Sequence, residues 1–150
     1  MKQLVPDFLF QLPRRETEQE ELLGNFLDSH KKECTPYFPW LTGEIIDFSG
    51  GETTLQIIRE YGSMRIHSRD LYDVLGGTER LMRTFDLNGG DDGMLEIQSV
   101  SGFITCIRRY SVDILLKNRT NYRDIIQLTG VSSRTIQRSK SFRIRMQYAN

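Results

Sequence analysis

The 150-residue sequence predicts a mainly α-helical protein with two short strands. Apolar side chains recur every three or four residues in several segments, an interval that places them on one face of a helix. Residues that favour helix N-termini precede these segments, and glycines follow several of them. The length corresponds to one domain or two very small ones, and such a chain can bury a core without disulfides or bound metals.

Three helices are expected before Gly62, after an irregular arm over residues 1–13. Thr17 and Glu20 have the spacing of a capping box, so the first helix should begin there and end near residues 30–32. Pro39 can open a short second helix. The third helix is predicted over residues 52–61, because a glycine follows it.

The middle of the chain is expected to hold two strands and two short helices. Residues 63–67 alternate in the manner of a strand, which needs a partner because a single strand leaves its edges unpaired. The helices are predicted over residues 69–75 and 78–85. A second strand is predicted over residues 94–97, after an acidic, glycine-rich loop over 86–93.

From Ser101 the helical pattern becomes regular, with four residues on one face: Ile104, Ile107, Ile114 and Leu115. A short helix capped by Thr120 or Asn121 should follow and end at Gly130, and Ser132 can cap a last helix. This order of helix, glycine turn and capped helix is that of a helix-turn-helix.

The turn itself is predicted from a few side chains. Gly130 can adopt the left-handed backbone conformation that a sharp turn between helices needs. Val131, Ile125 and Ile136 are expected to fill the wedge between the two helices.

The net charge of zero conceals two opposed halves. Residues 1–100 carry ten Lys and Arg against eighteen Asp and Glu, a net of −8, and residues 101–150 carry ten against two, a net of +8. Between residues 117 and 145 there are eight cations and one carboxylate. Such a segregated basic segment indicates a polyanion partner, so we predict that the protein binds double-stranded DNA.

The last helix carries the expected DNA-binding side chains. Base edges would be contacted by four residues three and four apart: Ser133, Arg134, Gln137 and Arg138. Arginine can bond guanine in two places, and glutamine can do the same to adenine. Phosphates would be contacted by a second set that positions the protein without reading sequence: Arg123, Ser132, Lys140, Arg143 and Arg145.

The sequence resembles the Mor transcription activators of Mu-like phages, which are also found in bacterial genomes. The matching segments are Phe38 to Leu41, Thr54 to His67 and Ile104 to Arg143. The family pattern is a helix ending in glycine, a short strand, and a long helix feeding a helix-turn-helix. The resemblance covers about two thirds of the chain in pattern, without near identity.

The resemblance implies a homodimeric activator. Residues 1–100 would form the dimerisation region, in which a strand of four residues pairs across the dimer axis: Met64, Arg65, Ile66 and His67. Residues 101–150 would bind an inverted repeat near a promoter, with RNA polymerase as a further partner. Arg134, Gln137 and Arg138 would then read the bases.

Three features depart from the family pattern. The segment from Leu75 to Gly102 is longer than expected, Ile126 stands where a small residue is usual, and Thr129 stands where an apolar one is usual. Either the two helices pack at an unusual angle, or the motif is degenerate.

Other functions find less support in the residues. The segment from Asp86 to Glu96 contains clustered oxygen ligands but fails the calcium-loop register, so we interpret it as a solvated turn. His30 and Cys34 lack a second ligand pair for zinc. No constellation indicates an enzyme, and neither a metal nor another cofactor is expected.

The alternative function is an adaptor that binds another protein through its acidic N-terminal region, including Phe8, Leu9 and Phe10. No apolar run is long enough for a membrane span. Cys34 and Cys106 form no motif with each other, so we expect a cytoplasmic protein with reduced thiols.

Overall fold

The computed structural model describes Val5 and residues 12–77, 79–88 and 92–148, with the side chains of residues 80, 87, 88 and 142–148 outside that description. The described chain is mainly helical, with one small sheet, as predicted. Its elements are α1 (Glu18–Ser29), α2 (Lys31–Cys34), a 3-10 turn η1 (Thr35–Tyr37), α3 (Trp40–Tyr61), β1 (Arg65–His67), α4 (Ser68–Leu75), α5 (Glu79–Asn88), β2 (Met94–Glu96), α6 (Val100–Lys117), α7 (Tyr122–Thr129) and α8 (Ser133–Tyr148). The residues Phe8, Leu9 and Phe10 of the adaptor hypothesis lie outside the described residues.

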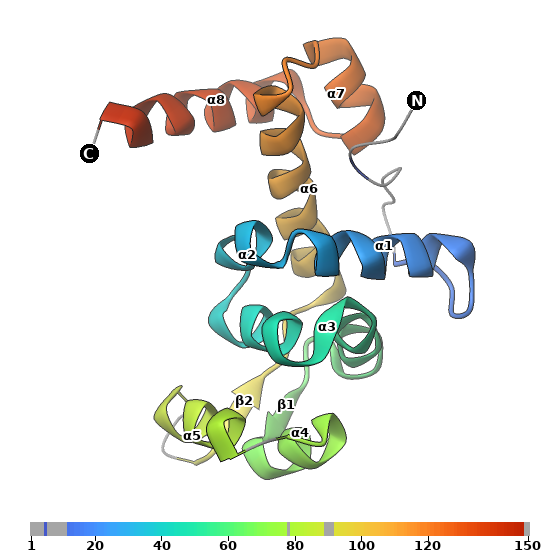
Figure 1. Cartoon of the computed structure of the whole chain (residues 1–150), viewed down its shortest axis with the longest axis vertical. Coiled ribbons are helices and arrows are strands. Elements are labelled where there is room, and N and C mark those ends of the chain that lie inside the picture. Colours follow the sequence, from blue (N-terminus) through green and yellow to red (C-terminus); the bar gives the residue numbers. More distant parts are fainter. Residues whose placement is uncertain (1–4, 6–11, 78, 89–91, 149–150) are drawn as a thin grey trace.

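Helix α6 lies between the N-terminal helices and the pair α7 and α8, and it connects them (Figure 1). One end packs on η1 and α3, and the other carries α7 and α8. The ring of Phe103, near the start of α6, lies 5.4 Å from the ring of Phe38. Of the predicted apolar face, Ile104, Ile107 and Leu115 are buried. Because α6 begins at the predicted boundary near residue 100 and contacts both sides, it joins the acidic and basic parts of the chain.

Helix α1 begins at its predicted cap and packs closely on α3 through glycines. Thr17 caps α1 as predicted, since its Oγ1 accepts a hydrogen bond of 3.3 Å from the Glu20 N–H. Helix α3 spans both predicted helices but is interrupted at Gly50, whose φ is +87°. A Cβ atom on Gly51 would lie 2.3 Å from the carbonyl oxygen of Gly24, so α1 and α3 approach each other too closely there for a side chain.

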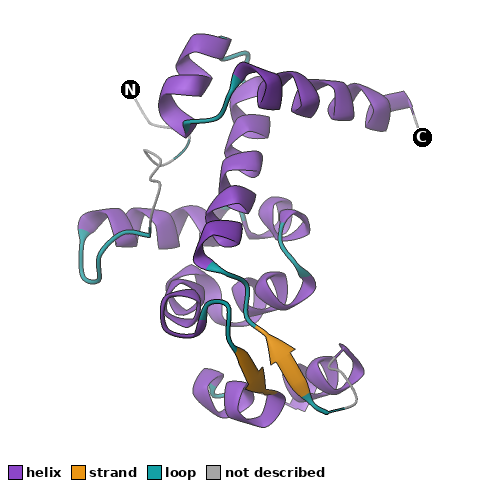
Figure 2. Ribbon diagram, turned by 180° about the vertical axis from the view of Figure 1, so that it is seen from behind, coloured by secondary structure: helices purple, strands orange, loops and turns teal. Residues whose placement is uncertain are grey.

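The two strands lie at the end of the molecule opposite α7 and α8 (Figure 2). β1 and β2 are antiparallel, with Ile66 opposite Leu95. Hydrogen bonds of 3.0 and 2.9 Å from Ser63 N to Ile97 O and from Ile97 N to Met64 O continue the pairing beyond β1.

Residues 65–67 find a strand partner within the same chain, and the expected pairing of residues 64–67 across a dimer axis stays a prediction. The longer segment after Leu75 folds into α5 and returns as β2, so it supplies the partner within the same chain. Met64 lies outside β1 and is 52% exposed.

No helix in the described ranges combines the length and apolar character needed to cross a membrane.

Candidate nucleic-acid interface

Helix α7 is bounded as the sequence predicted. Asn121 is the N-cap, because its Oδ1 accepts a hydrogen bond of 2.9 Å from the Asp124 N–H. Its side-chain amide also donates to Asp124 Oδ2 at 3.1 Å. At the other end Gly130 has a φ of +71° and its N–H donates to the carbonyl oxygen of Ile126 at 2.8 Å. The left-handed glycine ends α7 and redirects the chain.

Ser132 sets the start of α8. Its Oγ accepts a hydrogen bond of 3.2 Å from the Thr135 N–H, and its carbonyl oxygen accepts from the Ile136 N–H at 3.2 Å. The two side-chain hydroxyls of Ser132 and Thr135 also lie 3.1 Å apart. A serine in this role satisfies N–H groups that have no partner within the helix.

The wedge between α7 and α8 contains the predicted apolar side chains. Ile125 and Ile136 are both fully buried, and Val131 packs against the core cluster to which they belong. Leu115 of α6, 2% exposed, belongs to the same cluster. Contacts among α6, α7 and α8 thus hold α8 in one place relative to the core.

The two departures inside the motif have separate structural reasons. Thr129 is fully buried, but its hydroxyl donates a hydrogen bond of 2.6 Å to the Ile125 carbonyl oxygen and accepts one of 3.4 Å from the Val131 N–H. A polar side chain is therefore satisfied at this position. Ile126 is 38% exposed and lies outside the wedge, so its bulk does not separate the helices.

The four residues expected to contact bases are all exposed: Ser133, Arg134, Gln137 and Arg138. Within the described part of the chain, neither Arg134 nor Arg138 forms a salt bridge. Both guanidinium groups are thus available to a ligand.

The residues expected to contact phosphates are less uniform. Arg123, in the first turn of α7, is exposed, and so is Ser132. The Lys140 ammonium lies 6.0 Å from the centre of the Tyr122 ring, which brings it back over the start of α7. The side chains of Arg143 and Arg145 are outside the described set, although the backbone of α8 continues through them and projects away from α6 (Figures 1 and 2).

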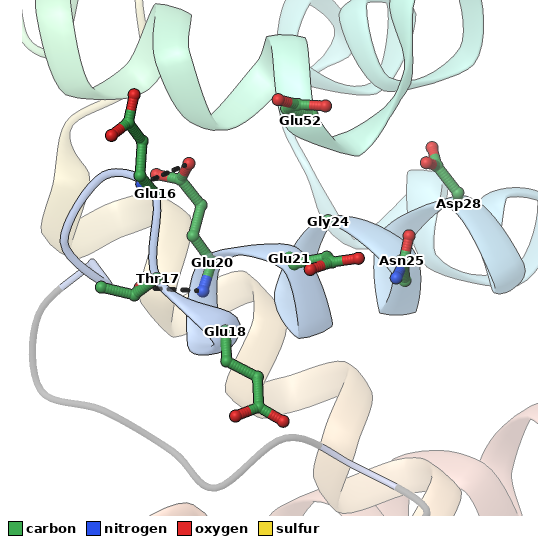
Figure 3. Close-up of a pocket in the computed structure, with 9 residues that line it drawn as sticks. All are labelled: Glu16, Thr17, Glu18, Glu20, Glu21, Gly24, Asn25, Asp28 and Glu52. Atoms are coloured by element: carbon green, nitrogen blue, oxygen red, sulfur yellow. Dashed lines mark hydrogen bonds between the residues drawn. The ribbon is translucent and has the colours of Figure 1, made fainter.

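The acidic half presents a groove along α1 with a volume of about 510 Å³. Figure 3 shows the residues that line it: Glu16, Thr17, Glu18, Glu20, Glu21, Gly24, Asn25, Asp28 and Glu52. The Glu20 carboxylate forms a salt bridge of 2.5 Å with Arg59, which also donates to the Pro13 carbonyl oxygen at 2.6 Å. Sequence reasoning did not find this groove, because Glu52 of α3 joins the carboxylates in and beside α1 only in the folded chain.

The residues considered for metals have other contacts. His30 Nδ1 lies 2.8 Å from the Tyr110 hydroxyl oxygen, and the Cys34 thiol is buried. In the acidic loop, residues 89–91 lie outside the description. Asp92 accepts a hydrogen bond of 3.0 Å from the Met94 N–H and pairs with Arg65 at 3.0 Å, and these contacts, the N–H first, lower the pKa of its carboxyl group. Asp92 therefore anchors the start of β2.

Comparison of the chain with protein-family models, curated proteins and solved structures gives no match.

Proposed function

We propose that the protein is a sequence-specific DNA-binding transcription regulator that acts as a homodimer through residues 120–145. The observation that supports this most is the presence of two exposed arginines without salt bridges, Arg134 and Arg138, in the first turns of a helix fixed by its turn and core. A helix that reads bases needs both a backbone held in a fixed position and side chains that are free to contact the DNA.

The rigidity of α8 follows from its anchors. Ser132 caps the helix, the side chain of its residue Ile136 is fully buried, and Gly130 ends α7 in the turn before it. Specific recognition requires side chains held in a defined register, because each base pair presents its own pattern of donors and acceptors in the major groove.

The charge of this part of the molecule supports a polyanionic ligand. The α7 and α8 region holds most of the positive half of the chain, and Asp124, the carboxylate within residues 117–145, already accepts a hydrogen bond from Asn121. Cations that the fold does not neutralise release the counterions of DNA when they bind phosphates, which makes affinity fall with salt.

Homodimerisation and activation are the parts of the proposal that rest on the resemblance to Mor activators. Two copies of the unit would contact half-sites on one face of the duplex, about one helical turn or a multiple of it apart. Recruitment of RNA polymerase would make the outcome activation.

Salt-dependent binding of the full-length protein to mixed-sequence duplex DNA tests the proposal. We expect binding at about 50 mM salt that weakens steeply toward about 200 mM. Arg69→Ala is the matched control for arginine variants of α7 and α8, because Arg69 is an exposed arginine on α4, at the end of the molecule opposite these helices (Figure 1). It should leave binding unchanged.

A second candidate is an adaptor that binds a basic protein, and the acidic groove along α1 favours it. The same titration separates the two functions, since an adaptor leaves duplex DNA unbound at about 50 mM salt, where even non-specific DNA-binding proteins bind.

A further inference from the structure

The turn between α6 and α7 contains a residue in an unusual backbone conformation. Arg119 has a φ of +59°, in the left-handed region that side chains other than glycine rarely adopt. Its N–H donates to the Leu116 carbonyl oxygen at 3.0 Å, and the next N–H, that of Thr120, donates to the Leu115 carbonyl oxygen at 2.9 Å. These bonds close the end of α6 and hold Arg119 in that conformation.

Glycine is the residue that this position favours, and the chain uses it at two equivalent helix ends. Gly76, after α4, has a φ of +60°, and Gly130, after α7, has a φ of +71°. Only Gly lacks the Cβ atom that strains a left-handed backbone. An arginine at the end of α6 therefore destabilises the fold relative to glycine.

No salt bridge of the Arg119 side chain in the described structure offsets this strain. The Arg119 side chain is exposed and forms no salt bridge with another described residue. The two carboxylates of the basic half are engaged elsewhere, Asp113 with the Tyr37 hydroxyl and Asp124 with Asn121. Lys117 already places a cation in the last turn of α6, where its charge interacts favourably with the negative end of the helix dipole.

We propose that Arg119 is a further DNA-binding residue, whose guanidinium group bonds a backbone phosphate beside the start of α7. This inference rests on the proposed function and adds a contact to it. Arg119 precedes the N-cap Asn121 by two residues, so the positive end of the α7 dipole adds to the attraction for a phosphate. Strained backbone positions are found preferentially at active sites and ligand-binding sites.

The test compares Arg119→Gly with the parent protein in thermal unfolding and in binding to a mixed-sequence duplex over about 50 to 200 mM salt. Arg119→Gly should unfold at a higher temperature and bind DNA roughly threefold to tenfold more weakly at the low end of that range. The slope of log affinity against log salt should decrease in magnitude by about 0.9, the value for one lost phosphate contact.

The matched control is Ser63→Gly. Ser63 has a φ of +67° and precedes β1 by two residues, and β1 lies at the end of the molecule opposite α7 (Figure 1). This variant relieves the same kind of strain, so it should also unfold at a higher temperature, but it should bind DNA like the parent. Arg119→Lys keeps a cation and should retain most of the salt dependence.

Three results would overturn the inference. If Arg119→Gly binds the mixed-sequence duplex with the parent affinity and slope while Arg123→Ala binds it more weakly, Arg119 makes no contact and the proposed function stands. If Arg119→Gly unfolds at a lower temperature, Arg119 serves the fold. If the parent binds no duplex at about 50 mM salt, the proposed function fails and the inference fails with it.

Discussion

The buried hydroxyl group of Thr129 donates a hydrogen bond of 2.6 Å to the carbonyl oxygen of Ile125, one turn earlier in α7. The Thr129 hydroxyl oxygen in turn accepts a hydrogen bond of 3.4 Å from the Val131 N–H in the turn that leads to α8. A residue that looked out of place in the sequence thus connects the end of α7 to the turn. The polar group of Thr129 is therefore satisfied in the buried turn between α7 and α8.

Thr129→Val tests this role. Valine has nearly the same shape but offers no acceptor to the Val131 N–H, so we expect a loss of about 1 kcal/mol in the free energy of unfolding. Urea unfolding of both proteins measures the difference. Equal stability of parent and variant would mean that the Thr129 hydroxyl contributes nothing to the turn.

The wedge between α7 and α8 depends on Ile136 of α8 and not on Ile126 of α7. Ile136 is fully buried, so Ile136→Ala should cost about 2–5 kcal/mol through lost burial and the cavity left behind. Ile126 is 38% exposed, and we expect Ile126→Ala to cost less than about 1 kcal/mol. Similar losses for the two variants in urea unfolding would contradict the described wedge.

Asp28 of α1 caps the second part of α3. Its Oδ1 accepts a hydrogen bond of 2.7 Å from the Gly51 N–H, just after the interruption at Gly50. Asp28→Ala should therefore lower the free energy of unfolding by about 0.5–2 kcal/mol. Asp28→Asn keeps an acceptor oxygen and is the control with a smaller loss. The capping role is wrong if alanine and asparagine behave alike.

Alkaline pH should destabilise the fold through Cys34. Burial, aided by the nearby Glu33 carboxylate, raises the pKa of its thiol from 9.0 to about 11. Above pH 9 the unfolded chain loses this proton while the folded chain keeps it, so the free energy of unfolding should fall between pH 9 and 11, by roughly 2 kcal/mol. Below pH 9 this group causes no change.

The measurement is the slope of stability against pH in the parent and in Cys34→Ala. The variant also loses packing, so the slope and not the absolute stability is compared. Its slope should be shallower between pH 9 and 11. The free energy of unfolding should show a second decline at higher pH in both proteins, because burial raises the pKa of Tyr110 to about 12. Identical slopes from pH 9 to 11 would contradict the assignment to Cys34.

The helices and the wedge were predictable because their signals are local. The capping serine at 132, the glycine at 130 and the two isoleucines, Ile125 and Ile136, all lie within residues 125–136. Such neighbours in sequence are neighbours in the fold whatever the rest of the chain does.

What could not be predicted depends on contacts between distant segments or on backbone angles. The pairing of Ile66 with Leu95 joins strands separated by α4 and α5, and a short apolar segment does not specify its partner. The close approach of Gly51 to Gly24 likewise needs the crossing of α1 and α3. The positive φ of Arg119 has no sequence signal, since glycine is the residue that marks such positions.

Base reading is tested most directly by selecting bound duplexes from a random pool and then comparing variants on the selected and on random DNA. The account predicts an enriched pair of half-sites, on which Arg134→Ala binds more weakly by about 1–3 kcal/mol with relaxed preference at one position. Arg123→Ala should weaken both kinds of DNA alike, and Arg69→Ala neither. A pool without enrichment, or equal losses for Arg134→Ala on selected and random DNA, would contradict sequence-specific recognition by α8.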